Sequence, residues 1–375
     1  MRTSIIILNW NTRDLLRRFI PGILDSIRDE DAELVVADNG STDGSVEMLH
    51  ESFPKVRVMA FDRNYGFTGG YNKAISQIES EFCIMMNSDI EVGLGWFRPL
   101  IEALYKDPQI GACAPKLHSI YERDRFEYAG AAGGYIDRFG FPFCRGRIMS
   151  MTENDNGQYD GCPEGILWAT GACLLVRTAL YKRLGGLDDR FFAHMEEIDL
   201  CWRLQLEGYK IRIVPQSIVY HLGGASLPKS SPFKLQLNFR NNLLLLSNNL
   251  AKTFALEMAA EEDNRMMDEA ARVKEKKDQT IADKAVRKAR RVIFLRKVID
   301  GLIAAAYLIA LKPARFKAVL LAHRQYDKMK NQITVSPEYI RRMAGLQIRG
   351  IYKGCIVLET VIYGKRIFDH LHGKI

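Results

Sequence analysis

The sequence predicts an α/β protein: a mostly parallel, doubly wound sheet flanked by helices and followed by a C-terminal helical extension. Three observations carry this prediction. Strand-like and helix-like segments alternate through the first 120 residues, as they do when helices connect parallel strands. Several of the apolar strand-like runs end in clusters of polar residues. After about residue 233 the pattern changes to long helical stretches.

The individual elements follow from the period of the apolar residues. In the first part, strands are predicted at 4–9, 33–38, 56–60, 82–86 and 111–116, and helices at 14–27, 69–78 and 96–106, with a turn at 39–45 that leads into a helix. Weak patterning and many glycines predict loops and short antiparallel strands at 118–162. Beyond them, a buried run is predicted at 165–176, a helix at 196–206, and short strands at 211–214 and 217–220.

We expect two regions, a catalytic domain at 1–235 and a helical, basic region at 236–375. Between Arg272 and Lys297 there are eleven Lys or Arg residues and three acids, an excess that equals the net charge of the whole chain, +8. The remainder is therefore formally neutral, and the basic segment lacks interleaved aromatic residues, so nucleic acid is not an expected partner.

The C-terminal region also contains an apolar run at 301–311 (GLIAAAYLIAL) with basic residues on both sides. Its eleven residues are fewer than the roughly 20 that a membrane-spanning helix needs. A short apolar helix with basic neighbours fits one that lies on an anionic membrane surface. The alternative is a core helix beside a solvated charged segment.

The cysteines and the N-terminus indicate the compartment. The seven cysteines are scattered and form no C-x-x-C pair, which argues against a disulfide framework or a structural zinc site. The apolar run at the N-terminus is too short for a secretory signal. We therefore expect a cytoplasmic protein.

Polar clusters follow three of the predicted strands. They are Asn9 with Asn11, Asp38 with Asn39, and Asn87-Ser88-Asp89. Ligands of doubly wound sheets bind at the carboxyl ends of the strands. Asp38 could accept a hydrogen bond from a nucleobase N–H or a ribose hydroxyl, or it could form an Asx turn.

Two residues are candidate metal ligands. Asp89 offers a carboxylate to Mg²⁺ or Mn²⁺ that bridges a diphosphate, since such ions take few ligands from protein. His221 ends a predicted strand and could also bind metal, although a lone histidine is more often structural. A simple strand-end turn is the alternative for Asp89.

The segment Arg63–Gly70 (RNYGFTGG) lies between the third strand and the next helix. Its glycines would let backbone approach a ligand, and the helix start could favour phosphate. The spacing is not G-x-G-x-x-G, so the dinucleotide fingerprint is absent. A glycine loop that serves packing alone is the other interpretation.

The densest group of functional residue types is FFAHMEEIDLCWR at 191–203. Glu196 and Glu197 precede or begin a helix. Asp199 lies in its first turn, where we expect it to contact substrate. One carboxylate that lines a pocket could act as a general base toward a hydroxyl nucleophile. The structural alternative is that the three acids only complement the helix dipole.

Seven stretches, taken in order along the chain, resemble the family-2 glycosyltransferases with a GT-A fold. They are SIIILNWN, VVADNGSTDGS, RNYGFTGGYN, MMNSDIEV, TGACLLVR, FFAHMEEIDLCWR and VYHLGG. The resemblance covers about residues 3–225. Within the family, the sequence looks most like bacterial rhamnosyltransferase-like enzymes of cell-surface polysaccharide assembly. It implies a nucleotide-diphosphate sugar donor, linked to dTDP or UDP, and a saccharide or polyprenyl-linked glycan acceptor. It also implies inversion at the anomeric carbon by a single displacement.

The resemblance assigns roles residue by residue. Asp38 would contact the nucleobase, and Arg63, Asn64 and Gly66 would lie near the donor. Asn87-Ser88-Asp89 would occupy the D-x-D metal position, where Asn87 replaces the usual first acid, and His221 would complete the metal site. Thr170-Gly171-Ala172 would lie close to donor sugar and acceptor. The catalytic base would be Glu197, where the family has an aspartate, with Glu196 as the alternative.

Other classes of protein fit the sequence less well. A nucleotidyltransferase that makes sugar nucleotides would need an N-terminal glycine-rich loop with a basic residue, and SIIILNWNT has neither glycine nor lysine. A nicotinamide dehydrogenase would need the absent glycine fingerprint. A carbohydrate- or membrane-binding module without catalysis would not need the acidic cluster at 196–199.

Overall fold

The computed structural model describes residues 2–161, 164–223, 231–263 and 271–374. Their main sheet has the strand order β3-β2-β1-β4-β11-β6-β12-β5. These strands are β1 (Thr3–Asn9), β2 (Ala32–Asp38), β3 (Arg57–Ala60), β4 (Phe82–Asn87), β5 (Ile90–Val92), β6 (Ile110–Ser119), β11 (Cys173–Arg177) and β12 (Lys210–His221). All except β11 and β5 point the same way, as the pairings show, which confirms the predicted mostly parallel sheet.

The order of the strands brings the predicted polar clusters together. In the register of the sheet, Asn9 on β1 pairs with Asp38 on β2. On its other side, Leu8 of β1 pairs with Asn87 at the end of β4. Carboxyl ends that are far apart in the sequence therefore meet at one edge of the sheet.

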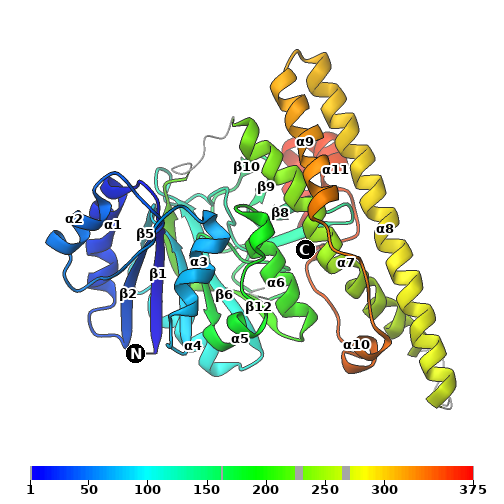
Figure 1. The fold of residues 1–375 in the computed structure, drawn as a ribbon, viewed down its shortest axis with the longest axis horizontal. Coiled ribbons are helices and arrows are strands. Elements are labelled where there is room, and N and C mark those ends of the chain that lie inside the picture. The colour runs from blue at the N-terminus through cyan, green and yellow to red at the C-terminus, as the bar shows by residue number, and fades with distance from the viewer. Residues whose placement is uncertain (1, 162–163, 224–230, 264–270, 375) are drawn as a thin grey trace.

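Helices cover both faces of this sheet (Figure 1). In the N-terminal part they are α1 (Arg13–Ser26), α2 (Ser45–Ser52), α3 (Gly66–Ser76), α4 (Phe97–Lys106), α5 (Thr178–Arg183) and α6 (Glu196–Leu206). Neighbouring residues of β1 alternate between two cores, because Ile6 packs into one cluster and Ile5 and Ile7 into the other. Burial on both sides explains why the strands read as continuous apolar runs.

A second, smaller sheet has the order β10-β9-β8-β7-β13. Its strands are β7 (Gly134–Asp137), β8 (Pro142–Cys144), β9 (Arg147–Ile148), β10 (Met151–Thr152) and β13 (Ile351–Tyr352). The first four pair antiparallel, as predicted for 118–162. The fifth comes from the C-terminal region and pairs parallel with β7, a long-range contact that no local pattern signals.

The C-terminal region is helical. It consists of α7 (Pro232–Asp263), α8 (Ala271–Ile309), α9 (Pro313–Met329), α10 (Pro337–Arg342), α11 (Ile356–Tyr363) and α12 (Ile367–Leu371). Across the described part of the chain, no helix combines the length and the apolarity needed to cross a membrane.

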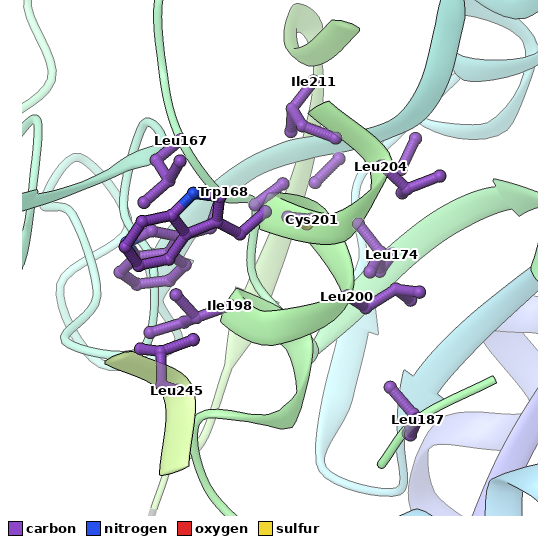
Figure 2. Close-up of a cluster of buried hydrophobic side chains, with 14 of the residues drawn as sticks. Leu167, Trp168, Leu174, Leu187, Ile198, Leu200, Cys201, Leu204, Ile211 and Leu245 are labelled. Atoms are coloured by element: carbon purple, nitrogen blue, oxygen red, sulfur yellow. The ribbon is translucent and has the colours of Figure 1, made fainter. Parts of the chain in front are cut away.

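Packing crosses the expected boundary at residue 235. Figure 2 shows α6 enclosed by apolar side chains, among them Ile198 and Leu200 of α6 itself and Leu245 of α7. The same buried cluster includes Ile367 of α12. The helical region therefore shares a core with the α/β part and supports α6, which carries the two candidate catalytic glutamates.

Candidate active site

The first two polar clusters form one hydrogen-bonded group at the strand ends. Asn9 Nδ2 donates to Asp38 Oδ2 at 2.6 Å and lies 3.1 Å from Ser41 Oγ. The backbone N–H of Ser41 donates to Asp38 Oδ1 at 2.8 Å. Asn9 and Asp38 are both buried. The turn after β2 thus holds the carboxylate in place, as an Asx turn does, at the edge where ligands of such sheets bind.

Thr12 links this group to the third cluster. Its hydroxyl donates to Asn9 Oδ1 at 2.6 Å and lies 2.9 Å from the Ser88 hydroxyl. Asn11 shapes the same turn, since it has a positive φ of 55° and its Oδ1 accepts the N–H of Thr42 at 2.8 Å. The sequence prediction missed Thr12, whose only signal was its place in the polar stretch after β1.

Asn39 holds the loop at Arg63–Gly70. Its Nδ2 donates to Asn64 Oδ1 and to the Gly66 carbonyl, each at 3.0 Å, and its Oδ1 accepts the N–H of Tyr65 at 3.0 Å. Arg63 lies over the ring of Tyr65 at 4.9 Å. The loop is therefore packed against the strand end that carries Asp38.

The start of α3 does not serve the expected phosphate role. Gly66 has a φ of +74°, and a Cβ there would lie 2.4 Å from the ring of Phe192, so glycine is required. The first amides of the helix, those of Phe67 and Thr68, donate to the Phe192 carbonyl at 2.8 and 3.2 Å. Because a protein carbonyl already occupies them, these amides are not free for phosphate, and the expectation is corrected.

Asp89 and His221 face each other near the ends of two strands. His221 Nε2 lies 3.2 Å from Asp89 Oδ1, and both side chains are buried. The backbone also joins them, since the N–H of Leu222 donates to the Asp89 carbonyl at 3.1 Å. Gly224 of the VYHLGG stretch lies outside the described residues.

Glu127, which the sequence prediction missed, completes this group. Its Oε2 lies 3.1 Å from His221 Nδ1 and accepts the N–H of Ala129 at 2.5 Å. Burial opposes ionisation of Glu127, but the hydrogen bond and charge of His221 outweigh it and lower its pKa. Burial likewise disfavours charged His221, yet Asp89 and Glu127 raise its pKa to about 10.

The pair fits a divalent cation. Adjacent ligands of an octahedral ion with bonds of about 2.1 Å lie about 3 Å apart, close to the 3.2 Å between His221 Nε2 and Asp89 Oδ1. A carboxylate behind the other ring nitrogen is the usual arrangement around metal-bound histidine, and Glu127 provides it. Among the described residues no three His, Cys, Asp or Glu side chains gather into a metal centre, so further ligands would have to come from substrate or water.

Glu196 and Glu197 begin α6. The Oε2 atom of each is buried without a hydrogen-bond partner. Burial raises the pKa of Glu197 to about 7, partly offset by backbone hydrogen bonds. Burial and the charge of Glu197 raise the pKa of Glu196 well above its usual range. Of the two, Glu197 is therefore the one that ionises near neutral pH, which a general base requires.

Thr170-Gly171-Ala172 connects the glutamates to the strand end. A Cβ on Gly171 would lie 3.2 Å from Glu197 Cβ, so the backbone passes close to that side chain. The Ala172 carbonyl accepts the N–H of Asn87 at 3.0 Å, and the Thr170 hydroxyl donates to the Ala129 carbonyl at 2.7 Å. The predicted site residues Asn87, Thr170, Gly171, Ala172 and Glu197 are thus neighbours.

The loop that precedes α6 is strained and held by α7. Phe192, His194 and Met195 have φ values of 64°, 72° and 74°, which non-glycine residues rarely adopt. Asn241 Nδ2 lies within hydrogen-bond distance of the carbonyls of Phe191, Ala193 and His194, at 3.0, 2.7 and 2.7 Å. Its neighbour Arg240 also donates to the Phe191 carbonyl, at 2.7 Å.

Asp199 has only internal contacts. Its Oδ2 accepts from Arg203 Nε at 2.6 Å, and its Oδ1 accepts from Asn248 and Asn249 at 2.9 Å each. The side chain has no exposed surface. This geometry anchors α6 on α7, a different role from the substrate contact expected from the sequence.

Comparison with known families decides the class of the domain. The model of Glycosyl transferase family 2 matches residues 4–162. Residues 4–162 are therefore a family-2 glycosyltransferase domain. The match covers β1, β2 and β4 with the polar clusters at their ends, and it ends before the glutamates of α6.

Curated relatives extend the similarity of this glycosyltransferase beyond residue 162. An N-acetylglucosaminyl-diphospho-decaprenol L-rhamnosyltransferase of Mycobacterium tuberculosis is 26% identical over 258 residues, or 65% of this chain and 83% of the relative. The low-salt glycan biosynthesis hexosyltransferase Agl10 of Haloferax volcanii is 22% identical, over 67% of this chain and 77% of the relative. An O-antigen biosynthesis protein of Myxococcus xanthus is 26% identical, but the match spans only 18% of its length.

The fold is confirmed by a solved structure. GalNAc-T7, determined with UDP, GalNAc and Mn²⁺, superposes with a TM-score of 0.53 at 16% identity. The alignment covers 73% of this chain and 53% of that one. At this identity the likeness shows the GT-A fold alone.

Proposed function

We propose that this glycosyltransferase moves a sugar from a nucleotide-diphosphate donor to a hydroxyl group of a saccharide or lipid-linked saccharide, with inversion at the anomeric carbon. One observation carries the proposal. Glu197 has a buried, unpartnered Oε2 and a pKa raised to about 7, and it packs against Gly171, beside the residue that bonds to Asn87. A base is thus held near the strand ends where a nucleotide sugar would bind.

In the proposed mechanism Glu197 removes the proton of the acceptor hydroxyl. The resulting oxygen nucleophile attacks the anomeric carbon from the side opposite the diphosphate, which inverts the configuration. Burial and the neighbouring carboxylate raise the pKa of Glu196 well above its usual range, which favours the neutral form of this side chain. A neutral Glu196 adds no second negative charge beside the attacking oxygen, and no covalent intermediate with the enzyme is needed.

At the other end of the site, Asp38 with Asn9 would hold the nucleoside, and Arg63, Asn64 and Gly66 would border the donor. Asp89 and His221 would hold Mg²⁺ or Mn²⁺ against the donor diphosphate. When bound, such an ion supplies positive charge that offsets the charge of the diphosphate leaving group. Glu127 fixes the orientation of the His221 ring through Nδ1 and leaves Nε2 facing Asp89.

The nature of the substrates is proposed from the relatives. The mycobacterial relative is named as a rhamnosyltransferase that acts on an N-acetylglucosaminyl-diphospho-decaprenol. We therefore propose rhamnose, linked to dTDP or UDP, as a candidate donor sugar and a polyprenyl-linked glycan as acceptor. Such a reaction belongs to the assembly of a cell-surface polysaccharide.

The surface of the C-terminal helices supports docking on an anionic membrane. Residues 301–309 end α8, and 310–311 lead into the hairpin with α9, which projects from the molecule in Figure 1. Most residues of the run are exposed, so it is not a core helix. Large apolar side chains of the hairpin are exposed, namely Leu302, Leu308, Ile309, Leu311, Leu320 and Leu321. Exposed cations lie among them, namely Lys312, Lys317 and Arg324. This combination fits a peripheral site at the inner face of the cell membrane, where a lipid-linked acceptor would reside.

A donor screen tests the reaction class. The protein is incubated with dTDP- and UDP-sugars and with saccharide or polyprenyl-linked acceptors, and release of the nucleoside diphosphate is measured with Mg²⁺ or Mn²⁺ and with EDTA. We expect acceptor-dependent release that EDTA abolishes. Synthesis of a sugar nucleotide from a sugar phosphate and a nucleoside triphosphate, without glycosyl transfer, would overturn the proposal.

Two isosteric variants assign the base. Glu197→Gln should lower kcat by about 10²- to 10⁴-fold, the range for loss of general base catalysis. Glu196→Gln should have a much smaller effect, since Glu196 is already neutral in the mechanism. Near-full transfer by Glu197→Gln together with loss in Glu196→Gln would show that the assignment is reversed.

A further inference from the structure

Arg147 on β9 is a buried cation without a matching anion. The side chain is 7% exposed, and its Nε is buried without a hydrogen-bond partner. Nη2 donates to Cys144 Sγ at 3.3 Å, and sulfur is a weak acceptor. The guanidinium also lies 4.7 Å from the centre of the Tyr128 ring. In the described part of the chain, no carboxylate forms an ion pair with it.

Another buried arginine, by contrast, has a paired carboxylate. Arg296 is 4% exposed, and its Nε donates to Asp300 at 2.7 Å while Nη1 donates to Asn242 at 2.6 Å. A buried charge is costly unless it is paired and hydrogen-bonded. Arg147 lacks this compensation, so its burial is better explained by a negative group that arrives with a ligand.

The small sheet directs Arg147 toward the active site. Cys144 and Arg147 are paired across the tight β8–β9 turn, so their side chains share one face of it. Burial raises the pKa of the Cys144 thiol, Arg147 counteracts this, and the charges of Glu197 and Glu127 add to the rise. Cys144 therefore lies within electrostatic reach of Arg147 and of both active-site carboxylates.

The segment 127–130 gives the same placement from direct contacts. Glu127 bonds to His221, and the Ala129 carbonyl accepts from Thr170. Tyr128, between them, lies under the guanidinium of Arg147. One short segment thus touches the candidate metal ligand, the stretch beside Glu197, and Arg147.

We propose that Arg147 forms an anion-binding subsite that receives a phosphate group of the acceptor substrate. The planar guanidinium matches phosphate oxygens with two parallel N–H donors. The subsite belongs to the acceptor because the donor end is built from the ends of β1, β2 and β4, whereas Arg147 comes from the second sheet. The assignment rests on the proposed function, since it requires an acceptor that carries phosphate, as a lipid-diphosphate-linked saccharide does.

Binding measurements on the full chain test the subsite without requiring transfer. Farnesyl diphosphate serves as the acceptor probe, titrated in EDTA so that a metal-bridged diphosphate does not contribute. UDP and dTDP with Mg²⁺ report on the donor end. Arg147→Met should weaken farnesyl diphosphate binding by about 10- to 100-fold, the value of a charge-assisted hydrogen bond or two, and leave UDP and dTDP unchanged. Arg147→Lys should restore part of the affinity.

Arg145→Met is the matched control, because Arg145 is equally buried in the same hairpin but lines a cavity of about 200 Å³ beside α12 that Arg147 does not line. It should leave farnesyl diphosphate binding intact. The melting temperature of Arg147→Met should equal or exceed that of the wild type, since an unpaired buried charge is removed. The proposal would be overturned if the wild type did not bind farnesyl diphosphate, or if Arg147→Met bound it as well as the wild type does. It would also be overturned if Arg147→Met lost as much affinity for UDP or dTDP, or if its melting temperature fell enough to account for the loss. If the donor screen shows no transfer but Arg147→Met still loses farnesyl diphosphate affinity as predicted, the subsite stands and only the proposed function is refuted. The two proposals can therefore be refuted independently.

Discussion

Replacing Asn241 with leucine tests whether α7 holds the strained loop before α6, the helix that carries the proposed base. The amide has two N–H groups that reach the carbonyls of Phe191, Ala193 and His194 at 2.7 to 3.0 Å. Leucine keeps the approximate volume but removes both donors. At about 1 kcal/mol for each hydrogen bond lost, plus about 1 kcal/mol or more for carbonyls left buried without a partner, the cost is ~2–4 kcal/mol in the free energy of unfolding.

The loop itself has little local preference for its conformation. Positive φ at three non-glycine positions costs about 1 kcal/mol or more each, so the external anchor is needed to maintain it. Without the anchor Glu196 and Glu197 lose their fixed positions, and kcat should fall more than tenfold at a temperature where the variant is still folded. Urea denaturation gives the free energy, and initial rates of nucleoside diphosphate release give kcat.

Thr253→Val on the same helix is the matched control. Thr253 is fully buried and accepts the Trp202 indole N–H at 2.9 Å, so it also joins α7 to α6 but does not touch the loop. This variant should lose about 1 kcal/mol of stability and keep its kcat. If both variants lost stability and only Thr253→Val lost activity, or if Asn241→Leu retained wild-type kcat, the anchoring argument would be refuted.

Three further predictions follow from the site and the surface. Because burial raises the pKa of Glu197 to about 7, and only the ionised carboxylate acts as base, kcat should fall as the pH drops below about 7 and level off above it. Glu127→Gln should weaken Mn²⁺ binding in the presence of UDP by about 10- to 100-fold, as loss of a carboxylate behind a metal-bound histidine does, measured by titration calorimetry. Leu308→Asp with Leu311→Asp should reduce sedimentation with anionic liposomes, while Leu94→Asp, an exposed leucine of the α/β part, should not.

Each of these has an outcome that contradicts it. A flat pH profile from 5 to 8 would exclude Glu197 as the titrating base. Unchanged Mn²⁺ affinity in Glu127→Gln would leave that residue a structural role only. Equal liposome binding by the wild type and the hairpin variant would remove the hairpin from the membrane surface.

The same pKa shift predicts a stability effect. A carboxyl group whose pKa is raised on folding stabilises the folded state at low pH, and this contribution is lost as the pH rises toward the folded-state pKa. For Glu197 that window extends from its usual value near 4.5 to about 7. Glu197→Gln should therefore be more stable than the wild type at pH 8 and similar to it at pH 4, as measured by urea denaturation at both values.

Local patterns determined much of the fold in advance. Apolar runs predicted β1, β2 and β4, and the polar residues that follow them predicted which side chains meet at one edge of the sheet. This works because burial on both faces makes a central strand uniformly apolar, so the first polar residues mark the point where the chain leaves the sheet. The ordered motifs also identified the family, and the acidic pair at 196–197 was visible as a cluster.

The tertiary structure alone decided which groups meet. Glu127 lies 94 positions from His221, and Asn241 lies about 50 from the carbonyls it holds, so no local period records either contact. A glutamate in a loop and an asparagine in a long helix have the same local signature as solvated residues. The surroundings likewise distinguish Glu197 from Glu196, and Arg147, which has no ion pair among the described residues, from the equally buried Arg296, which pairs with Asp300. The cost of a charge depends on the groups that the whole fold builds around it.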